Sequence, residues 1–457
     1  MAPVGLGAYR PRSAAIQSMP ELKRALGPVM LWGLGVGYVI SGMYFGWNLG
    51  LPLGGTWGML AATVVATILY VTFIFSYTEL SCAIPRAGGA FDFGLRAFGP
   101  TGGLLLGVAQ IVEFLFAPPA IAAAIGAYFN LFFPTISPVA IAIVAYVLFT
   151  ALNIWGVKQA AAFELFITIA AVGELVLFMA VTAPHFHAAN LAKDGLPQGW
   201  GGAFACLPFA VWMYLGIEGV ANVAEEARDP RRDISRGFGW AMATLVVLGL
   251  GVFVTSVGVA GWSAVVYPSP GAAPSDSPLP LALSHVVSGR GAMFHLLVTV
   301  GLFGLVASFH GIVLAAGRAA LELGRTGYAP AFVGRIHPRT GTPAAALVVN
   351  AVIGVAAILS SRTGDLIVLS GFGALTLYAL SMVALFRLRR TEPALPRPFR
   401  AVAYPLFPAI ALGLSLVSLG AMIWTNRAVA LVYAAILAGA GVYWKVLGRR
   451  PRAASPQ

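Results

Sequence analysis

The residues best suited to chemistry are five glutamates inside long apolar stretches of this 457-residue chain. Glu113, Glu174 and Glu218 are expected near the middle of their stretches, where a carboxylate needs a partner or a proton. Glu79 and Glu164 lie nearer the ends, where a structural role is the favoured interpretation. No Lys or Arg lies near the middle of a stretch, so the deep charged residues are acids without bases. A cavity of this kind suits a cationic solute or a proton better than an anion.

One of these acids, Glu218, follows Gly216 closely in the stretch FAVWMYLGIEGVANVAEE (209–226). Flexible backbone beside a carboxylate indicates a break in a membrane-spanning helix. Trp212 and Tyr214 lie on either side of the expected break, where aromatic rings could stack over an ammonium group. Core packing explains both aromatic residues equally well, and a protonated structural acid is the alternative for Glu218.

A second break is expected in YVISGMYFGW (38–47), which lies within an apolar run long enough to cross a bilayer. Gly42 has no Cβ and can leave helical geometry, which frees backbone groups at membrane depth. Such a break must face protein or a water-filled cavity, so Ile40, Ser41, Gly42 and Met43 become candidate substrate contacts. Glycines also allow close helix packing, and this stretch alone leaves both interpretations open.

The other candidates for chemistry are few. His310, in ASFHGIV, could relay protons, although an isolated helical histidine more often packs in a core. The sequence contains no Walker A motif, no HExxH and no CxxC pair, so we expect no enzymatic activity, no metal and no cofactor. Cys82 and Cys206 lie in apolar stretches and are expected to be small core residues rather than a disulfide.

The elements that must position these residues are membrane-spanning helices. The chain is 59% hydrophobic and only 10% charged, with a mean hydropathy of +0.86, whereas soluble domains carry about a quarter charged residues. We count twelve apolar stretches, each long enough for a bilayer core of about 30 Å. They are 27–50, 55–84, 98–127, 138–156, 159–183, 203–224, 237–260, 292–322, 343–361, 364–388, 402–424 and 429–447.

The net charge is +12, and the distribution of the basic residues along the chain is the one expected of a membrane protein. With the N-terminus inside, 24 of the 28 Lys and Arg residues fall on the cytoplasmic side, which is the positive-inside bias. Both termini are therefore expected in the cytoplasm, at residues 1–26 and 448–457, with the lipid bilayer as the main surroundings. No basic face is left over for nucleic acid. The first 26 residues lack the apolar core of a cleaved signal peptide.

The two expected breaks fall in the first and sixth apolar stretches, five helices apart. Broken helices at matching positions of two halves indicate an inverted-repeat transporter. We therefore expect a first repeat of five helices over 27–183, a second over 203–388, and two further helices over 402–447. The predicted fold is an all-α membrane protein with twelve transmembrane helices and discontinuous helices 1 and 6.

Several motifs resemble the amino acid–polyamine–organocation (APC) transporter superfamily over nearly the whole chain. They are VISG, AIPRAGGAF with Ala87 where the family usually has serine, WMYLGIEGVANVAEEARDPRRDI with Ser235 where proline is usual, and RTGYAPAFVGRIHPRTGTPAAAL. Within that superfamily the chain is most similar to bacterial ethanolamine permeases, through ISGMYFGW, FIFSYTEL, IVEFLFAPPAIAAAIGAYFN, GIEGVANVAEEA and GLFGLVASFHG. The resemblance implies a five-plus-five inverted-repeat fold with the substrate at the two breaks.

The resemblance also implies roles for single residues. Ser41 and Gly42 match a substrate-contacting break, and Trp212 matches an aromatic residue that closes over the substrate in related exchangers. Glu218 and Glu113 match acids linked to proton sensing and proton coupling. One feature departs from the pattern: some proton-coupled members have a lysine in helix 5 where this chain has Ala171, and Glu174, one turn on, is the nearest ionisable substitute.

The resulting hypothesis is a secondary transporter that imports ethanolamine across the bacterial inner membrane by alternating access, driven by protons. The alternative within the same fold is a proton-coupled amino acid permease. A transporter-like sensor or a channel is the alternative from another class, and the lack of an appended signalling domain counts against a sensor. The sequence leaves open symport or exchange, protons or sodium, and the oligomeric state.

Overall fold

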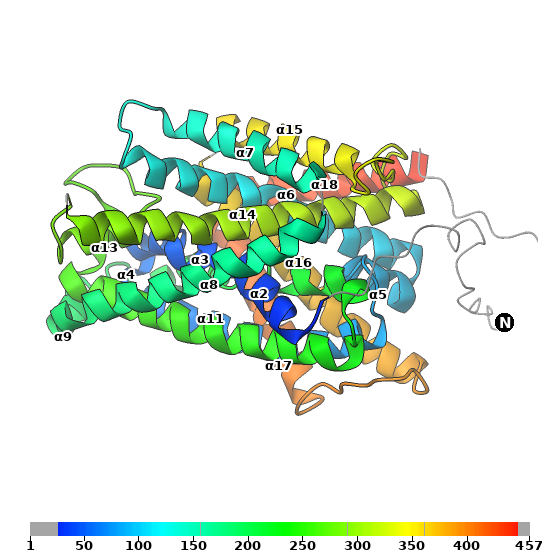
Figure 1. Cartoon of the computed structure of the whole chain (residues 1–457). Helices are drawn as coiled ribbons and strands as arrows, with labels where there is room; N and C mark the ends of the chain where they lie inside the picture. Colours follow the sequence, from blue (N-terminus) through cyan, green and yellow to red (C-terminus); the bar gives the residue numbers. More distant parts are fainter. Residues whose placement is uncertain (1–25, 156, 290, 361, 447–457) are drawn as a thin grey trace, which may run out of the picture.

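The computed structural model describes residues 26–446 except 156, 290 and 361. Within these residues all regular secondary structure is helical, and the only β-type pairing is an isolated bridge between Leu26 and Ala227. Figure 1 shows a bundle of long helices that run in one common direction, with short helices at its two ends. The predicted all-α fold is confirmed.

Ten segments of the described chain are long and apolar enough to cross a membrane, and two shorter apolar segments bring the total to the expected twelve. Nine of these segments contain one long helix each, of which α4 is kinked at Gly55. They are α4 (Leu51–Ala83), α6 (Pro100–Asn130), α7 (Pro138–Trp155), α8 (Val157–Thr182), α11 (Pro230–Ala260), α14 (Ala292–Thr326), α16 (Thr363–Thr391), α17 (Leu406–Thr425) and α18 (Arg427–Val446). The tenth long segment consists of α10 (Gly199–Trp212) followed by the 3-10 helix η3 (Ile217–Glu226). One of the two shorter segments consists of α2 (Pro28–Val39) followed by α3 (Ser41–Tyr44), and the other is α15 (Ala344–Ser360).

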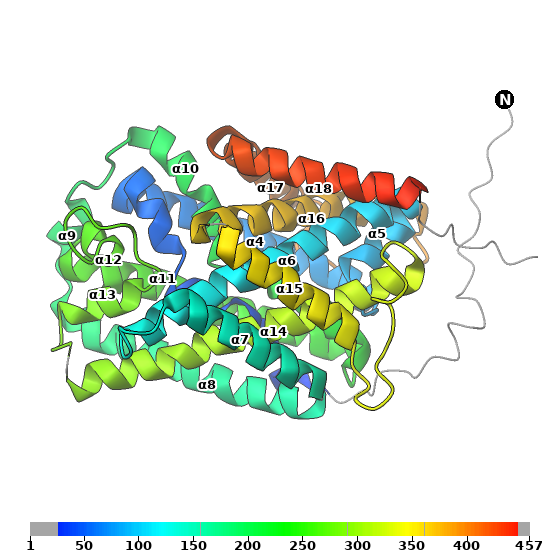
Figure 2. The ribbon, with the colours of Figure 1, turned by 90° about the horizontal axis from the view of Figure 1, so that it is seen from above.

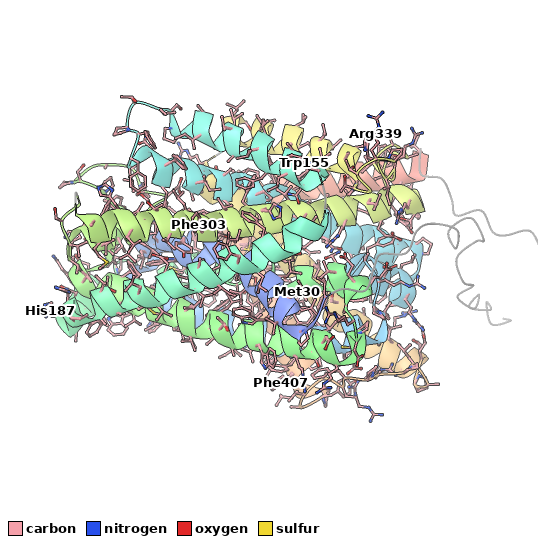
Figure 3. The ribbon with its side chains drawn as sticks, viewed as in Figure 1. Met30, Trp155, His187, Phe303, Arg339 and Phe407 are labelled. Atoms are coloured by element: carbon pink, nitrogen blue, oxygen red, sulfur yellow. The ribbon has the colours of Figure 1, made fainter. Side chains whose placement is uncertain are left out.

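The flanks of the bundle expose large apolar side chains, as lipid contact requires. Trp155 is 82% exposed and Phe303 is 40% exposed, and Figure 3 shows both on the side of the bundle. His187 and Arg339 mark the two opposite ends. The protein is therefore a multi-pass membrane protein.

The first apolar segment is broken, but a few residues beyond the predicted Ser41–Gly42, which are helical. α2 ends at Val39, Ile40 forms a turn, and α3 adds only four residues before Phe45 takes an extended conformation. Gly46 then has a φ of 89°, which side chains other than glycine rarely adopt. The 3-10 helix η1 (Trp47–Gly50) leads into the first residues of α4, and a kink at Gly55, which has a φ of 62°, separates them from the rest of that helix. The regular part of the second helix therefore begins at about the expected residue 55.

The sixth apolar segment is broken as well. α10 ends at Trp212, and Met213–Gly216 forms a turn that closes at Gly216 with a φ of 100°. The chain continues as η3, a 3-10 helix rather than the expected α-helix. This segment also begins at Gly199 and ends at Glu226, a few residues beyond the expected span of 203–224.

The broken segments lie inside the bundle and the last two helices lie at its edge. α2 packs against α8, α11, α14 and η3, while α6 packs against α14 and α16. Figure 2 shows α17 and α18 along one edge of the bundle and α8 along the opposite edge. The division into two five-helix repeats over 27–183 and 203–388 stays a prediction.

The two ends of the bundle differ in chemistry. At one end, here called the α13 end, lie η2 (Ala183–His185), α9 (Ala188–Ala192), α12 (Trp262–Val266) and α13 (Pro278–Ser284) (Figure 1). The opposite end, here called the α5 end, carries α5 (Ala90–Phe98). Arginine–glutamate ion pairs gather at the α5 end, between Arg96 and Glu392, Arg318 and Glu226, and Arg389 and Arg397 with Glu79.

Glu79 lies at the centre of the strongest of these clusters. Its side chain is 1% exposed, and it accepts hydrogen bonds from Arg389 Nε at 2.9 Å and from the backbone N–H of Ala401 at 2.7 Å. Arg397 Nε lies 3.0 Å from the same carboxylate. These contacts join α4 to α16 and the segment that follows it, which is the structural role expected for this acid.

The Glu79→Gln variant should lose about 3 kcal/mol of unfolding free energy, because it leaves two arginines near a buried site without their counter-charge. The matched control is Glu392→Gln, whose pair with Arg96 has side chains 33% and 23% exposed. That change should cost about 1 kcal/mol or less. Thermal unfolding in detergent measures both, and equal losses in the two variants would contradict the assignment.

Candidate functional site

The two helix breaks touch each other at the centre of the protein. A Cβ placed on Gly42 would lie 2.7 Å from the carbonyl oxygen of Trp212 and 2.8 Å from that of Met213. These carbonyls belong to the end of α10, where the helix stops. The absence of a side chain at Gly42 therefore lets the backbone of the first break pack directly on the backbone of the sixth segment.

Trp212 covers the first break from the side of α10. Its indole N–H donates to the carbonyl of Phe45 at 3.1 Å, and its ring meets the Phe45 ring edge-on at a centroid distance of 5.4 Å. The same ring lies where a side chain on Gly46 would have to go. Ile40 and Met43 are both fully buried in this packing.

Ser41 points from the first break toward α14. Its hydroxyl lies 2.7 Å from the hydroxyl of Ser308, which in turn donates to the carbonyl of Tyr38 at 2.6 Å. Ser41 is 3% exposed. In this conformation its hydroxyl is thus engaged with α14, and Ser308 is a partner that the sequence reasoning did not find.

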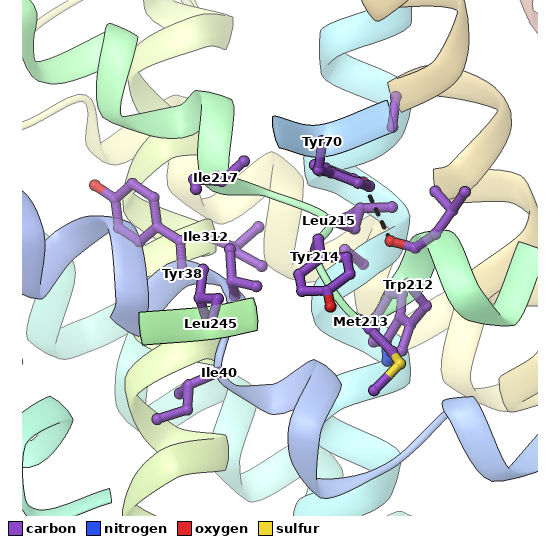
Figure 4. Close-up of a cluster of buried hydrophobic side chains, with 14 of the residues drawn as sticks. Tyr38, Ile40, Tyr70, Trp212, Met213, Tyr214, Leu215, Ile217, Leu245 and Ile312 are labelled. Atoms are coloured by element: carbon purple, nitrogen blue, oxygen red, sulfur yellow. Dashed lines mark hydrogen bonds between the residues drawn. The ribbon is translucent and has the colours of Figure 1, made fainter. Parts of the chain in front are cut away.

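Beside the sixth break, three tyrosines form a row in which each contacts the next, and the last one reaches the carboxyl group of Glu218. The Tyr214 hydroxyl lies 2.9 Å from that of Thr67, and its ring packs on Tyr70 at 5.4 Å (Figure 4). Tyr70 donates to the carbonyl of Val211 at 3.1 Å and its hydroxyl lies 3.1 Å from that of Tyr378. Sequence reasoning missed Tyr70 and Tyr378; the available signal was a phenol inside an apolar span, which needs a hydrogen-bond partner.

Glu113 and Glu218 are brought together at the end of this row. Both are 0% exposed, and their carboxyl groups lie within hydrogen-bonding range of each other and of the Gly216 backbone. Tyr378 donates to Glu218 at 2.8 Å. Two carboxyl groups this close cannot both be ionised without a cation, so in its absence the pair holds a proton.

Three oxygens of this pair have unused hydrogen-bonding capacity. Within the part of the chain that the structure describes, no N–H or O–H group with regular geometry donates to either oxygen of Glu113 or to Oε1 of Glu218. Buried polar atoms are rarely left in this state. Three acceptors on two neighbouring carboxyl groups equal in number the three N–H donors of a primary ammonium group.

Glu174 lies apart from this pair, with the first break. It accepts a hydrogen bond from the Tyr44 hydroxyl at 2.6 Å, and Tyr44 also reaches the carbonyl of Ala171 at 3.2 Å. The Tyr128 hydroxyl donates to the Tyr44 carbonyl at 3.1 Å. Glu174 and the two tyrosines line a small pocket beneath α13.

His310 also lies apart from the Glu113–Glu218 pair. Its Nδ1 is 3.0 Å from Oε2 of Glu164, and both side chains are 1% exposed. The sequence placed Glu164 near a helix end with a structural role and did not pair it with His310. Among the residues that are described, no group of three or more His, Cys, Asp or Glu side chains is arranged to hold a metal ion.

A larger cavity of about 810 Å³ opens at the α13 end. Its lining includes Leu49, which follows the first break, and Leu366 of α16. The side chain of the neighbouring Ile367, like the ring of Trp212, lies close to Gly46 of the first break. The cavity therefore approaches the two breaks from the α13 end, and Trp212 and Ile367 lie between the cavity and Gly46.

The fold and this site together define a membrane transporter with two unwound helices around a central acidic pair. A family model described as amino acid permease matches residues 26–442. The chain belongs to this family, and with it to the APC superfamily.

Three curated relatives cover most of this chain. An uncharacterised transporter of Rhizobium meliloti (strain 1021) is 29% identical over 85% of this chain and 83% of its own length. The branched-chain amino acid permease BcaP of Bacillus subtilis (strain 168) is 24% identical over 87% and 88%. The methylthioribose transporter of the same organism is 23% identical over 87% and 88%. These relatives support a transport function, and their names cover chemically different solutes.

The Gly42→Ala variant should reduce transport by roughly tenfold, since overpacking of 1–3 kcal/mol would separate the two breaks. The matched control is Gly413→Ala on α17, where an added methyl would meet nothing within 4 Å. Both variants should elute from a sizing column as the wild type does. Wild-type uptake by Gly42→Ala would show that close contact between the breaks is dispensable.

The loop before α13 contains an acid that should respond to pH. Asp276 lines the 810 Å³ cavity and accepts a hydrogen bond from Thr363 at 2.8 Å. Burial raises the pKa of Asp276 to about 6, and the bond from Thr363 limits the rise. The folded protein therefore favours the protonated form, and the associated stability is lost as the pH rises through about 6.

Between pH 5 and pH 8, the wild-type protein should thus lose more thermal stability than the Asp276→Asn variant, which has no proton to release. Asp365→Asn is the control, because Asp365 lines the same cavity but is exposed. Melting temperatures in detergent at the two pH values measure the effect. The same pH dependence in wild type and Asp276→Asn would rule out this acid as its source.

Proposed function

We propose that this protein is a secondary transporter that imports ethanolamine by alternating access. Its central site would be the Glu113–Glu218 pair beside the break at Gly216. The substrate ammonium would bind to the unused carboxyl oxygens of the pair. Ile40–Met43 of the first break and Trp212 and Tyr214 of the sixth segment would enclose the rest of the molecule.

The observation that carries this proposal is the unused hydrogen-bonding capacity of three buried carboxyl oxygens, for which no described residue is a donor with regular geometry. No Lys or Arg occurs in α2, α4, α6, α10 or η3, and the arginines of α16, the helix of Tyr378, lie near its C-terminal end rather than beside the pair. The site therefore has a deficit of donors and of positive charge, and an ammonium group supplies both. An anionic solute would meet repulsion from the same oxygens.

An amino acid is the second candidate substrate. The family description and the name of the relative BcaP favour it. Its ammonium would use the same acids, and its carboxylate would need N–H donors from the first break, as at a half-helix N-terminus. Ethanolamine would offer a hydroxyl there instead, which makes a weaker contact. Competition between the two solutes therefore discriminates between the candidates.

We further propose that the α5 end faces the cytoplasm of a bacterial cell, across its inner membrane. The arginine-rich ion pairs of that end support this orientation by the positive-inside rule. The cavity lined by Asp276 would then open to the outside. Protons are the proposed coupling ion, with Glu113, Glu174, Glu218 and His310 as candidate carriers.

Uptake of radiolabelled ethanolamine into proteoliposomes, with and without an acidic exterior, tests the substrate and the coupling. We expect saturable uptake that the pH gradient increases and that excess amino acids leave unchanged. Strong inhibition by one amino acid, with little uptake of ethanolamine, would assign the protein to the second candidate. Uptake that fails to saturate would contradict a carrier mechanism.

Glu113→Gln and Glu218→Gln should each reduce uptake by at least roughly tenfold, because each replaces a charge-assisted hydrogen bond worth about 1.5–3 kcal/mol. Glu225→Gln is the matched control, since this acid lies in the same η3 but has no part in the pair. It should transport at the wild-type rate. Wild-type uptake by both site variants would remove the acidic pair as the substrate site.

A further inference from the structure

Glu164 and His310 form a fully buried titratable pair outside the central site, with both side chains 1% exposed. Glu164 belongs to α8 and His310 to α14, and their side chains meet at 3.0 Å between Oε2 and Nδ1. α2, which carries the first break, packs against both helices. The pair therefore lies at the junction of one broken segment with two continuous helices.

The pair keeps hydrogen-bonding capacity that its surroundings do not use. Oε1 of Glu164, Nε2 of His310 and the hydroxyl of the nearby Thr168 are all buried without a partner among the described residues. A purely structural buried pair usually has its remaining atoms satisfied. Because Glu164 and His310 each keep a side-chain atom without a described hydrogen-bond partner, each can gain or release a proton without breaking an existing hydrogen bond.

Two glycines allow the backbone of neighbouring helices to lie close to Oε1 of Glu164, the carboxyl oxygen without a described partner. A Cβ on Gly37 of α2 would lie 2.5 Å from Glu164 Oε1 and 2.7 Å from the Thr168 hydroxyl, and one on Gly311 would lie 3.0 Å from the same oxygen. Glu164 is thus closed in by α2 and α14. Water can reach this oxygen only if α2 moves relative to α8 and α14.

Tyr38 connects this pair to the central site. Its ring lies where side chains on Gly311 of α14 and on Gly219 of η3 would have to go, so it fills the space between those helices. Gly219 directly follows Glu218. Figure 4 shows Tyr38 turned away from Trp212 and Tyr214, toward the opposite side of the sixth break. A shift of α2 would therefore change the packing at both the Glu164–His310 pair and the Glu113–Glu218 pair.

The other charged groups that face the pair are already engaged. Arg318 of α14 forms an ion pair with Glu226 of η3 at 2.7 Å. Tyr38 is the titratable group of α2, and its buried hydroxyl has no hydrogen-bond partner among the described residues. No described arginine or lysine contacts Glu164 itself, so His310 is its only positive partner when protonated.

We propose that Glu164 and His310 form the proton-binding site that couples the pH gradient to the movement of α2. In the enclosed state the pair holds one proton and is neutral overall, because a lone buried carboxylate beside apolar helices would be costly. When α2 moves and water reaches Glu164, that proton leaves to the solution. The inference rests on the proposed transport function, since the central pair would bind the substrate and leave the proton to be carried elsewhere.

Reconstituted Glu164→Gln and His310→Gln test this assignment, with His295→Gln, an exposed histidine of the same α14, as the control. Two assays separate the steps: exchange of internal for external ethanolamine at equal pH, and accumulation driven by an acidic exterior with an internal pH dye. Both site variants should keep exchange within about twofold of wild type. Both should lose accumulation and the substrate-induced acidification of the lumen. The control His295→Gln should keep exchange, accumulation and acidification.

A third readout needs no substrate. Infrared difference spectra of the wild type between pH 5 and pH 8 should contain the carbonyl band of a protonated carboxylic acid that is missing in Glu164→Gln and titrates differently in His310→Gln. Gradient-driven accumulation by both variants, or an unchanged band in Glu164→Gln, would overturn the proton site. If the wild type transports neither ethanolamine nor amino acids, the proposed function fails, and the infrared band still decides whether Glu164 binds the proton.

Discussion

The structure depends on backbone groups being satisfied where two membrane helices stop. In hydrocarbon an unpaired N–H or C=O costs several kcal/mol, so unwound backbone must be covered by protein. Here Gly42, just before the first break, packs on the carbonyls of Trp212 and Met213, and the indole of Trp212 donates to the carbonyl of Phe45. Each break thus covers the other. Continuous helices such as α6 and α14 surround them and keep lipid away.

The acids divide according to how completely they are satisfied. Glu79 at the α5 end has two arginines and a backbone N–H, and its role is to hold helices together. Glu113 and Glu218 have each other, one tyrosine and unused oxygens. A satisfied buried charge stabilises one conformation, whereas an unsatisfied one stores binding capacity for a proton or an ammonium group. The incomplete sites are accordingly the ones proposed for transport.

Much of this architecture was predictable because hydrocarbon imposes strict rules. Apolar stretches of about 20 residues located the twelve spans, and glycines located the sixth break at Gly216 and the first to within a few residues, at Gly46 rather than Gly42. Boundaries were less predictable: the short helical turns at residues 47–54, which precede the kink at Gly55, were not expected, although the regular part of α4 begins near the predicted residue 55. The 3-10 form of η3 was also missed, because hydropathy does not distinguish helix types. Motif resemblance correctly indicated the APC superfamily.

The sequence by itself determined that the deep charged residues are acids and that two helices are broken, because both follow from residue type and local spacing. Only the tertiary structure decided which acids meet. Glu113 pairs with Glu218 across 105 positions of the chain, and Glu164 turns from an isolated residue near a helix end into the partner of His310, 146 positions away. Such contacts depend on how helices rotate and pack against one another. Periodicity within one helix carries no information about the neighbour that the helix will face.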